Sequence, residues 1–324
     1  MKILVLCYEY PPVGGGGGRV AASVGAGLAS RGHEVRAVSA GLRHLPQREV
    51  IEGVEVLRPE SFRKREDTCS VTEMALYLAT SFFPALGLCR SWKPDVIHAH
   101  FVVPTGALAL ALHWLTGIPY VLTAHLGDVP GGVPEQTDKL FRWLGPFIRP
   151  IWKNAAAVTA VSGFVAELAV KNCGVFPKII LNGVPMLPPP SQLELQNPVR
   201  IVMVGRLSVQ KNPLLAIGAL SLIKDLPWRL EVIGEGPFAA PMRECVEENG
   251  LVDRVAFSGW LSAEEVSERL AASDILLMTS TSEGLPMAGI EALRHGLAIV
   301  GSRIGGLMDV VADGKNGLLC NLTP

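Results

Sequence analysis

Short apolar runs alternate with amphipathic stretches along most of the chain. In the first half we predict strands at residues 2–7, 34–39, 54–57, 96–100, 120–124, 157–161 and 178–181. Helical patterns fall between several of them, and the first, at residues 19–31, ends at Gly32. Strands that alternate with helices at this spacing indicate βαβ units around a parallel sheet.

A proline-rich segment interrupts this alternation. Four prolines within residues 185–190 precede the polar stretch SQLELQNP, which predicts a stiff linker. Beyond it we predict strands at 200–204, 229–233, 255–258, 275–279 and 298–301, and helices at 214–222, 241–249, 263–271 and 287–295. Asn212 is the expected N-cap of the first of these helices, with Pro213 at its first position.

The restart of the pattern predicts two domains of the same α/β class. We expect two Rossmann-like doubly wound domains, at residues 1–187 and 199–324, joined by a linker at 188–198 and facing each other across a cleft. Ligands of open α/β sheets bind beyond the carboxyl ends of the strands. Functional residues are therefore expected in the loops that follow strands.

Composition agrees with this class. The 324 residues are 49% hydrophobic and 18% charged, which is typical of globular domains. The net charge of -1 does not favour a nucleic-acid partner. The charge is uneven, because residues 1–187 carry 18 Lys and Arg against 14 Asp and Glu, and the remainder 11 against 16.

Cysteine spacing and apolar stretches bear on the compartment. The six cysteines include no CxxC pair, so we expect a reducing compartment, with neither disulfides nor a zinc site. The apolar stretches at 71–89 and 101–123 are interrupted by proline or glycine, and we expect helices and strands of an α/β domain rather than membrane spans. A cytoplasmic location follows as the expectation.

The strongest chemical signal is the run SEGLPMAGIEAL. Glu283 stands just before a predicted helix, and Glu291 stands two turns inside it. Carboxylates bind the vicinal hydroxyls of sugars and ribose, and the unpaired amides of a helix start bind phosphate or hydroxyl groups. A single acid at a helix start would be explained by the helix dipole alone.

A second motif makes a binding site the preferred interpretation. The loop GRLSVQKN follows the strand at 200–204 and carries Arg206 and Lys211 ahead of a helix. Two cations beside a helix start suit a diphosphate, whose charge moves to the leaving oxygen as its bond breaks. Solvated loop cations are the alternative.

The first half offers weaker candidates. The glycine run 14–18 is expected to form a loop before the helix at 19–31, where bare backbone amides approach an anion. His125 and Asp128 follow the strand at 120–124. His98 and His100 end another strand, and we favour a packing role for His98 and leave the role of His100 open.

Taken in chain order, the motifs resemble glycosyltransferase family 4, the group 1 family of retaining GT-B enzymes. The resemblance begins at KILVLCYEYPPVGGGGG and LASRGHEV and continues through PDVIHAH, the HLGD loop, AVS at 160–162 and LNGV at 181–184. It goes on through GRLSVQKN, VIGEGP and EGLPMAGIE to NGLLC, so it covers nearly the whole chain. Family members usually continue further, so we expect this chain to be either a fragment or naturally short.

The resemblance implies a donor site in the second domain for a nucleotide-diphosphate sugar, UDP- or GDP-linked. Arg206 and Lys211 would bind the diphosphate, and Glu291 the ribose hydroxyls. Glu283 would hold the donor sugar together with the backbone of three residues, Gly284, Leu285 and Pro286.

The resemblance also implies an acceptor side in the first domain. His125 would lie beside the sugar at the reacting centre, and with Glu283 it is the expected catalytic residue. The glycine loop, Gly15, Gly16 and Gly17, would border the phosphate and the acceptor, and Asp128 is a candidate on that side. The acceptor would be the hydroxyl of a glycan or a lipid-linked saccharide.

Two expected absences complete this hypothesis. The sequence contains no Asp-x-Asp pair, so we expect no metal and no cofactor, with the arginine and lysine in place of a cation. It also shows no nucleophile and acid pair of the glycosidase kind, so we expect retention without a covalent enzyme intermediate.

A basic cluster, Arg58, Arg63, Lys64 and Arg65, precedes the apolar stretch at 71–89. A solvated loop is the simpler interpretation of these charges. The alternative is a peripheral contact with an anionic membrane, which would bring the cleft near a lipid-linked acceptor.

Other functions stay open at this point. A nicotinamide dehydrogenase is suggested by Gly234, Gly236 and Ala239 after a strand, but the acid expected at the end of the next strand is missing. A GT-B epimerase or phosphorylase is a nearer alternative. A sugar-nucleotide-binding protein or inactive fragment is the non-enzymatic one.

Overall fold

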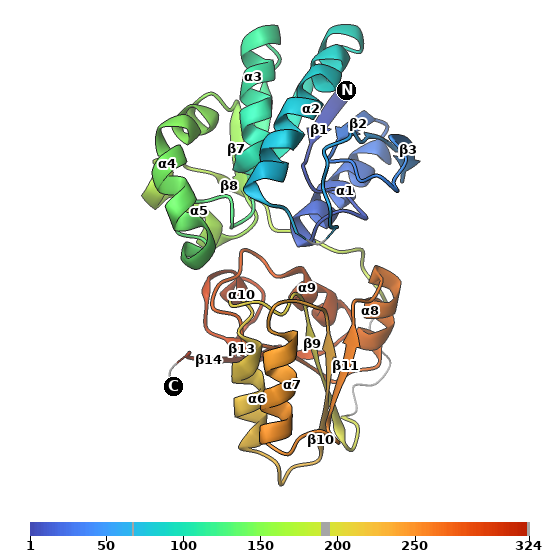
Figure 1. The fold of residues 1–324 in the computed structure, drawn as a ribbon, viewed down its shortest axis with the longest axis vertical. Coiled ribbons are helices and arrows are strands. Elements are labelled where there is room, and N and C mark those ends of the chain that lie inside the picture. The colour runs from blue at the N-terminus through green and yellow to red at the C-terminus, as the bar shows by residue number, and fades with distance from the viewer. Residues whose placement is uncertain (67, 189–194, 323–324) are drawn as a thin grey trace. The chain divides into compact units, whose positions relative to one another are not determined.

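The computed structural model describes residues 1–66, 68–188 and 195–322. The chain divides into two compact units, Met1–Leu181 and Asn182–Pro324. Figure 1 shows the first from blue to green and the second from yellow to red. Residues 189–194, which make up most of the predicted linker, lie outside the described residues.

The first unit is built on an eight-stranded sheet in the order β3-β4-β2-β1-β5-β6-β7-β8. Its strands are β1 (Lys2–Leu6), β2 (Glu34–Val38), β3 (Arg48–Ile51), β4 (Val54–Leu57), β5 (Val96–His100), β6 (Tyr120–Ala124), β7 (Ala157–Ala160) and β8 (Lys178–Ile179). Its helices are α1 (Gly16–Ala29), α2 (Val71–Ser91), the π-helical turn η1 (Val102–Gly106), α3 (Ala107–Thr116), α4 (Pro134–Lys153) and α5 (Gly163–Cys173). Neighbouring strands pair in parallel except β3 with β4.

The second unit has a six-stranded parallel sheet in the order β11-β10-β9-β12-β13-β14. Its strands are β9 (Val199–Val204), β10 (Trp228–Ile233), β11 (Val255–Gly259), β12 (Ile275–Met278), β13 (Ala298–Ser302) and β14 (Gly317–Cys320). Its helices are α6 (Pro213–Ser221), α7 (Ala239–Glu248), α8 (Ala263–Ala271), α9 (Met287–Arg294) and α10 (Gly305–Met308). This is the 3-2-1-4-5-6 order of the doubly wound nucleotide-binding fold.

In each sheet, successive strands are added first on one side of the first strand and then on its other side. The point where this direction changes is the switch point, and the loops on its two sides run apart. In the first unit this switch point lies between β1 and β5, and in the second between β9 and β12. Ligands of such sheets bind at the switch point, beyond the carboxyl ends of the strands. The loops after these four strands contain most of the predicted site residues. The structure thus confirms the predicted fold class of two Rossmann-like domains.

The sequence explains why these elements form. In the first unit β1, β2 and β4 bury apolar side chains such as Val5, Ala37 and Val56 in one cluster. Helix α2 begins with a capping box, in which Ser70 accepts from the amide of Glu73 while the Glu73 carboxylate accepts from the amide of Ser70. In the second unit, apolar clusters lie on both faces of the sheet.

One local prediction was wrong. Helix α1 begins at Gly16, three residues earlier than expected, so most of the glycine run is helix rather than loop. Asn212 and Pro213 stand at the N-cap and first position of α6, as predicted, but Asn212 has a left-handed backbone (φ 45°) and its side chain makes no cap hydrogen bond.

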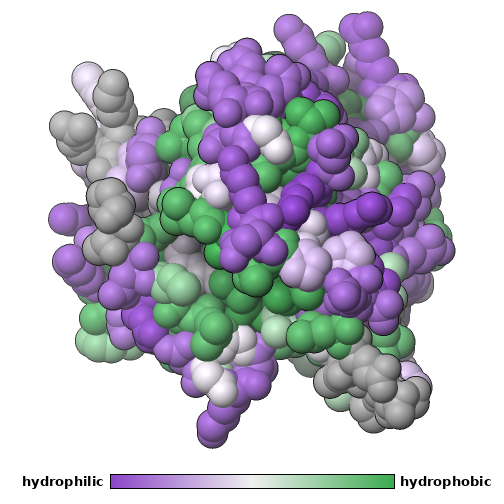
Figure 2. All heavy atoms as spheres, turned by 90° about the horizontal axis from the view of Figure 1, so that it is seen from below, coloured by the Kyte–Doolittle hydropathy of each residue, from purple (hydrophilic) through white to green (hydrophobic). Residues whose placement is uncertain are grey.

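Helix α2 is the one described helix that is long and apolar enough to cross a membrane. Tyr77, Ala85 and Leu86 of α2 are buried inside the first unit and α2 contacts α3, but only 22% of its most apolar 18-residue window is buried. Figure 2 shows hydrophobic atoms among hydrophilic ones on the face seen from below. Apolar atoms make up more than half of an ordinary protein surface, so this mixture indicates no particular partner.

Candidate functional site

Two loops at the switch point of the second unit are hydrogen-bonded to each other. The hydroxyl of Thr279, at the end of β12, donates to the carbonyls of Lys211 (3.1 Å) and Asn212 (2.9 Å). The amide of Thr281 donates to the carbonyl of Gln210 (2.8 Å), whose side-chain amide donates to the carbonyl of Ser282 (2.9 Å). The loops after β9 and β12 are therefore joined by several hydrogen bonds.

Lys211 and Glu283 meet on this surface, although 72 residues separate them. The Nζ of Lys211 lies 2.5 Å from Oε1 of Glu283, and the Ser280 hydroxyl donates to the same oxygen at 2.6 Å. Glu283 is only 6% exposed, whereas the lysine side chain retains 21% exposure. A buried carboxylate needs such partners, because an unpaired charge in the interior is costly. The structure thus brings two predicted donor-site residues into direct contact.

Arg206, on the same loop as Lys211, has different surroundings. Arg206 is exposed, so its guanidinium is available to a ligand. Gly205 before it has φ +138°, which favours glycine, and the Lys211 side chain passes 3.3 Å from the position that a Cβ would occupy there. The two cations of this loop therefore differ in their surroundings, because Lys211 pairs with Glu283 and Arg206 is exposed.

The neighbouring β10 loop fits tightly against this arrangement. A Cβ on Gly234 would lie 2.0 Å from the carbonyl oxygen of Gly205, and one on Gly236 would lie 2.3 Å from that of Leu207. These two glycines, which also suggested a dinucleotide fingerprint, are explained by the close approach of two loops. The packing gives no support to the dehydrogenase alternative.

The second carboxylate lies on the helix that follows. Gly284, Leu285 and Pro286 are buried and lead into α9, and Glu291 lies half-buried in its second turn. The carbonyl of Glu283 accepts from the amide of Gly306, and a Cβ on Gly306 would lie 1.9 Å from the Gly284 carbonyl oxygen. The start of the short α10 thus packs against the backbone of Glu283 and Gly284.

A cluster of histidines ends the strands β5 and β6 of the first unit. Nδ1 of His100 lies 3.2 Å from Nε2 of His125, and the His98 ring lies against that of His100 with centroids 4.3 Å apart. Nε2 of His98 shares a hydrogen bond with the Thr123 hydroxyl (2.8 Å). Burial lowers the pKa of His98 from 6.5 to about 4, with the neighbouring His125 acting in the same direction. Burial also lowers the pKa of His100 and His125.

Asp128 has a clear structural task in this cluster. Its Oδ1 accepts from the amides of His125 and Leu126 (both 2.9 Å), and its Oδ2 accepts from the amide of Val102 (2.8 Å). The carboxylate therefore joins the loop after β6 to the turn after β5. Asp128 positions His125, and an acceptor contact by Asp128 stays a prediction.

Phe101 is a site residue that the sequence did not single out. It has φ 71°, which is uncommon for a large side chain and is characteristic of strained functional segments. Its ring lies 4.4 Å from that of His125 and 5.0 Å from that of Tyr8. A Cβ on Gly17 would lie 2.3 Å from its Cζ atom. The only sequence signal was its place directly after a strand.

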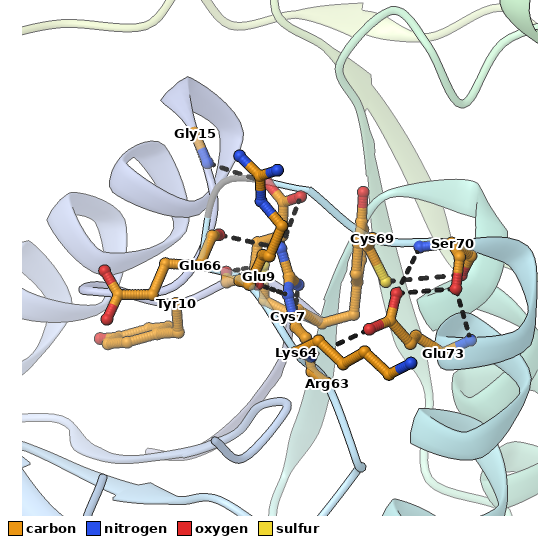
Figure 3. A network of polar contacts seen from close by, with 12 residues as sticks. Cys7, Glu9, Tyr10, Gly15, Arg63, Lys64, Glu66, Cys69, Ser70 and Glu73 are labelled. Carbon is orange, nitrogen blue, oxygen red and sulfur yellow. Dashed lines mark hydrogen bonds and ion pairs between the residues drawn. The ribbon is translucent and has the colours of Figure 1, made fainter. Parts of the chain in front are cut away.

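The glycine run at residues 14–18 contacts Glu9 through the amide of Gly15, as Figure 3 shows. The amide of Gly15 donates to Oε2 of Glu9 at 3.2 Å, so this carboxylate occupies the place where an anion was predicted. The amide of Gly14 donates to the carbonyl of Glu66 (2.7 Å). Gly16 and Gly17 belong to the first turn of α1. Their role toward a phosphate stays a prediction.

The basic cluster was interpreted wrongly for its first two members. Arg58 and Arg63 are 1% and 3% exposed, so their charges reach neither solvent nor a membrane. Arg58 donates to the carbonyls of Tyr10 (3.1 Å) and Pro11 (2.5 Å) and pairs with Glu49 (2.8 Å).

Arg63 is a second buried arginine that donates to backbone carbonyls. It donates to the carbonyl of Tyr8 (3.3 Å) and to those of Arg65 (2.9 Å) and Glu66 (3.0 Å). Its five donor N–H groups suit such a set of carbonyls. The two buried arginines thus donate hydrogen bonds to carbonyls of the loop after β1.

The fold and these loops define a class: two Rossmann-like domains of the kind found in GT-B glycosyltransferases. The family model for Glycosyltransferase Family 4 matches residues 14–186, and that for Glycosyl transferases group 1 matches residues 189–322. The chain therefore belongs to glycosyltransferase family 4, which confirms the resemblance and makes it a glycosyltransferase.

Curated relatives match over most of the chain. Glycogen synthase of Mycobacterium tuberculosis is 29% identical over 99% of this chain and 82% of its own length. The 2-deoxystreptamine glucosyltransferase of Streptomyces kanamyceticus is 28% identical over 75% of this chain and 68% of its own.

Solved structures share the fold. Sucrose-phosphate synthase from Thermosynechococcus elongatus superposes with a TM-score of 0.83 at 19% identity, covering all of this chain and 86% of that one. Anabaena HepE in complex with UDP-glucose gives a TM-score of 0.72 at 20% identity, covering 99% of this chain and 85% of that one.

Proposed function

We propose that this glycosyltransferase moves a sugar from a nucleotide-diphosphate sugar to a hydroxyl of a glycan or lipid-linked saccharide, with retention at the anomeric carbon. The observation that carries the donor is the Lys211–Glu283 pair at the switch point of a Rossmann sheet, with exposed Arg206 on the same loop. The UDP-glucose complex of HepE supports UDP as the first nucleotide to test.

The paired charges suit the departure of a diphosphate. Lys211 and Arg206 stabilise the negative charge that develops on the leaving oxygen, because preorganised cations act most strongly where charge develops. Glu283, already held by Lys211 and Ser280, accepts from hydroxyls of the donor sugar through its remaining lone pairs. Glu291, one helix turn and more beyond it, binds the ribose hydroxyls.

The reaction balances without a covalent enzyme intermediate. The bond between the anomeric carbon and the diphosphate oxygen breaks, and the acceptor oxygen bonds to the same face of that carbon. The acceptor proton passes to the departing diphosphate. We propose that His125 of the first unit lies beside this sugar.

No metal or cofactor enters this proposal. The described residues contain no group of three His, Cys, Asp or Glu side chains arranged to hold a metal ion. Undiminished turnover after treatment with EDTA would support metal independence, and restoration by Mg²⁺ or Mn²⁺ would refute it. A cytoplasmic location belongs to the same proposal.

The test is calorimetric titration of UDP, GDP and ADP into the full chain and into its Glu291→Gln variant. We expect one nucleotide to bind, with an affinity at least about tenfold lower in the variant, or roughly 1.4 kcal/mol. Glu247→Gln is the matched control, because Glu247 is exposed on α7 of the same unit. Equal binding by all three proteins would refute the assignment of Glu291, and binding by none would refute the donor site.

Turnover then separates the enzyme from a binding protein. The nucleotide that binds is supplied as its glucose conjugate with candidate glycans, and the anomeric configuration of the product is read by NMR. Inversion would refute the proposed mechanism, and a trapped glycosyl-enzyme adduct would refute the absence of a covalent step.

Membrane contact stays a prediction that depends on Lys64 and Arg65, which are exposed, and no longer on Arg58 and Arg63. Cosedimentation with liposomes of increasing anionic lipid content tests it. Binding independent of anionic lipid would refute the prediction.

A further inference from the structure

One buried nitrogen of the histidine cluster, Nε2 of His100, has no hydrogen-bond partner among the described residues. His100 is 0% exposed, and its Nε2 has no hydrogen-bond partner among the residues that the structure describes. Its other nitrogen, Nδ1, lies 3.2 Å from Nε2 of His125. The donor and acceptor in this contact depend on where the protons lie.

The surroundings limit the number of protons. Burial lowers the pKa of both His100 and His125, although Asp128 opposes this shift for His125. Near neutral pH each ring therefore carries a single proton. Two neutral imidazoles that face each other share one hydrogen bond, so one facing nitrogen donates and the other accepts.

The unpaired Nε2 of His100 decides the direction. If His100 accepted at Nδ1, its proton would lie on Nε2 as a buried N–H group without a partner. If it donates at Nδ1, only a lone pair is left unpaired. Buried donors without partners are rarer in proteins than under-satisfied acceptors. The second arrangement is therefore the favoured one.

We infer that His100 is a positioning residue: its Nδ1–H donates to Nε2 of His125 and thereby fixes the proton of His125 on Nδ1. The other ring nitrogen of His125, Nδ1, then carries the proton. It can donate a hydrogen bond but cannot act as a base. Its use toward an oxygen of the donor sugar rests on the proposed function. The tautomer itself does not.

The direct test is long-range ¹H–¹⁵N NMR of the full chain with ¹⁵N-labelled histidine at pH 7.5. The ¹⁵N shifts of the two ring nitrogens distinguish the tautomers, and a His125→Gln variant assigns the signals. We expect His125 to be protonated on Nδ1 and bare on Nε2. Protonation of His125 on Nε2 would overturn the inference, whatever the enzyme transfers.

Variants of His100 link the tautomer to catalysis. His100→Leu removes the Nδ1–H donor and keeps a side chain of similar size. His100→Asn keeps an N–H group near the position of Nδ1. We expect the leucine variant to lose the Nδ1 tautomer and to lower kcat at least about tenfold with KM for the donor little changed. The asparagine variant restores both. His98→Leu is the matched control, because His98 bonds to Thr123 and leaves the tautomer unchanged.

The outcomes separate this inference from the proposed function. If the tautomer shifts in His100→Leu while kcat does not, His100 positions a residue without a role in the reaction, and the link to catalysis is refuted. If leucine and asparagine variants lose activity equally, packing alone explains His100. A chain without any transferase activity still reports its tautomer.

Discussion

The polar groups near the two switch points differ in their exposure. In the first unit they are buried and mostly paired: Asp128 accepts from three amides, and Arg58 and Arg63 donate to carbonyls, whereas Nε2 of His100 has no partner among the described residues. In the second unit, Lys211 keeps part of its surface exposed beside a buried carboxylate. We therefore expect changes in the first unit to affect mainly the free energy of unfolding. Changes in the second unit should also affect the affinity for the nucleotide.

The largest effect is expected on acidification of the first unit, because three buried histidines act in the same direction. Because the folded pKa of His98 lies near 4 and the unfolded value near 6.5, protons bind preferentially to the unfolded chain as the pH falls below 6.5. The stability contributed by neutral His98 is complete above that value and decreases by at most about 2 kcal/mol on reaching about pH 5. His100 and His125, whose pKa values are also lowered by burial, add in the same direction.

Urea unfolding between pH 7.5 and 5 measures this dependence above the range where most carboxyl groups protonate. The His100→Leu variant should show a shallower slope. A free energy of unfolding that is constant over this interval would contradict the buried, neutral state of the cluster.

Next in size is the loss of the Lys211 ammonium. Lys211→Met leaves the Glu283 carboxylate buried beside Ser280 alone, and we expect a loss of about 2–3 kcal/mol in the free energy of unfolding together with loss of donor binding. Arg269→Met breaks the more exposed pair with Glu231 and should change stability by less than about 0.5 kcal/mol. Similar losses in both variants would show that burial does not distinguish the pairs.

A smaller effect is expected from adding one methyl group to the glycine segment. Gly17→Ala places a Cβ 2.3 Å from the Phe101 ring, so the ring beside His125 must move, at about 1–3 kcal/mol of stability. Gly15→Ala meets nothing within 4 Å and should be nearly neutral. Thermal unfolding of the two variants tests the contrast, and equal midpoints would argue against the close contact.

The smallest effect on folding is expected at Arg206. Because its side chain is exposed, Arg206→Gln should leave the free energy of unfolding within about 0.5 kcal/mol of the parent. Donor affinity should nevertheless fall about tenfold, since the arginine is proposed to bind the diphosphate. Calorimetry and urea unfolding of the same preparation measure both. An unchanged affinity would remove Arg206 from the donor site.

Local patterns were sufficient for most of the architecture. Alternating strands and helices predicted both sheets, and the motifs around Glu283 and Lys211 predicted residues that the structure brings within 2.5 Å. The edge strands β3 and β14 were not predicted, because each is only four residues long and buries few side chains, so its pattern differs little from that of a loop.

Burial of charge was the feature that the sequence could not reveal. Arg58 and Arg63 belong to a polar, basic segment, and only contacts 47 to 55 residues away show that they are interior. The same applies to Phe101, whose positive φ depends on neighbours from β6 and α1. Partners distant in sequence decide both cases.

The two buried arginines also bear on how this part of the domain can be re-engineered. Carbonyls of the loop at residues 8–15 accept hydrogen bonds from the side chains of Arg58 and Arg63, so the two segments depend on each other structurally. A chimera that imports the loop of a relative without its matching segment at 58–66 would leave guanidinium groups or carbonyls unpaired in the interior. Exchange of this loop between family members should therefore preserve folding only when both segments are moved together.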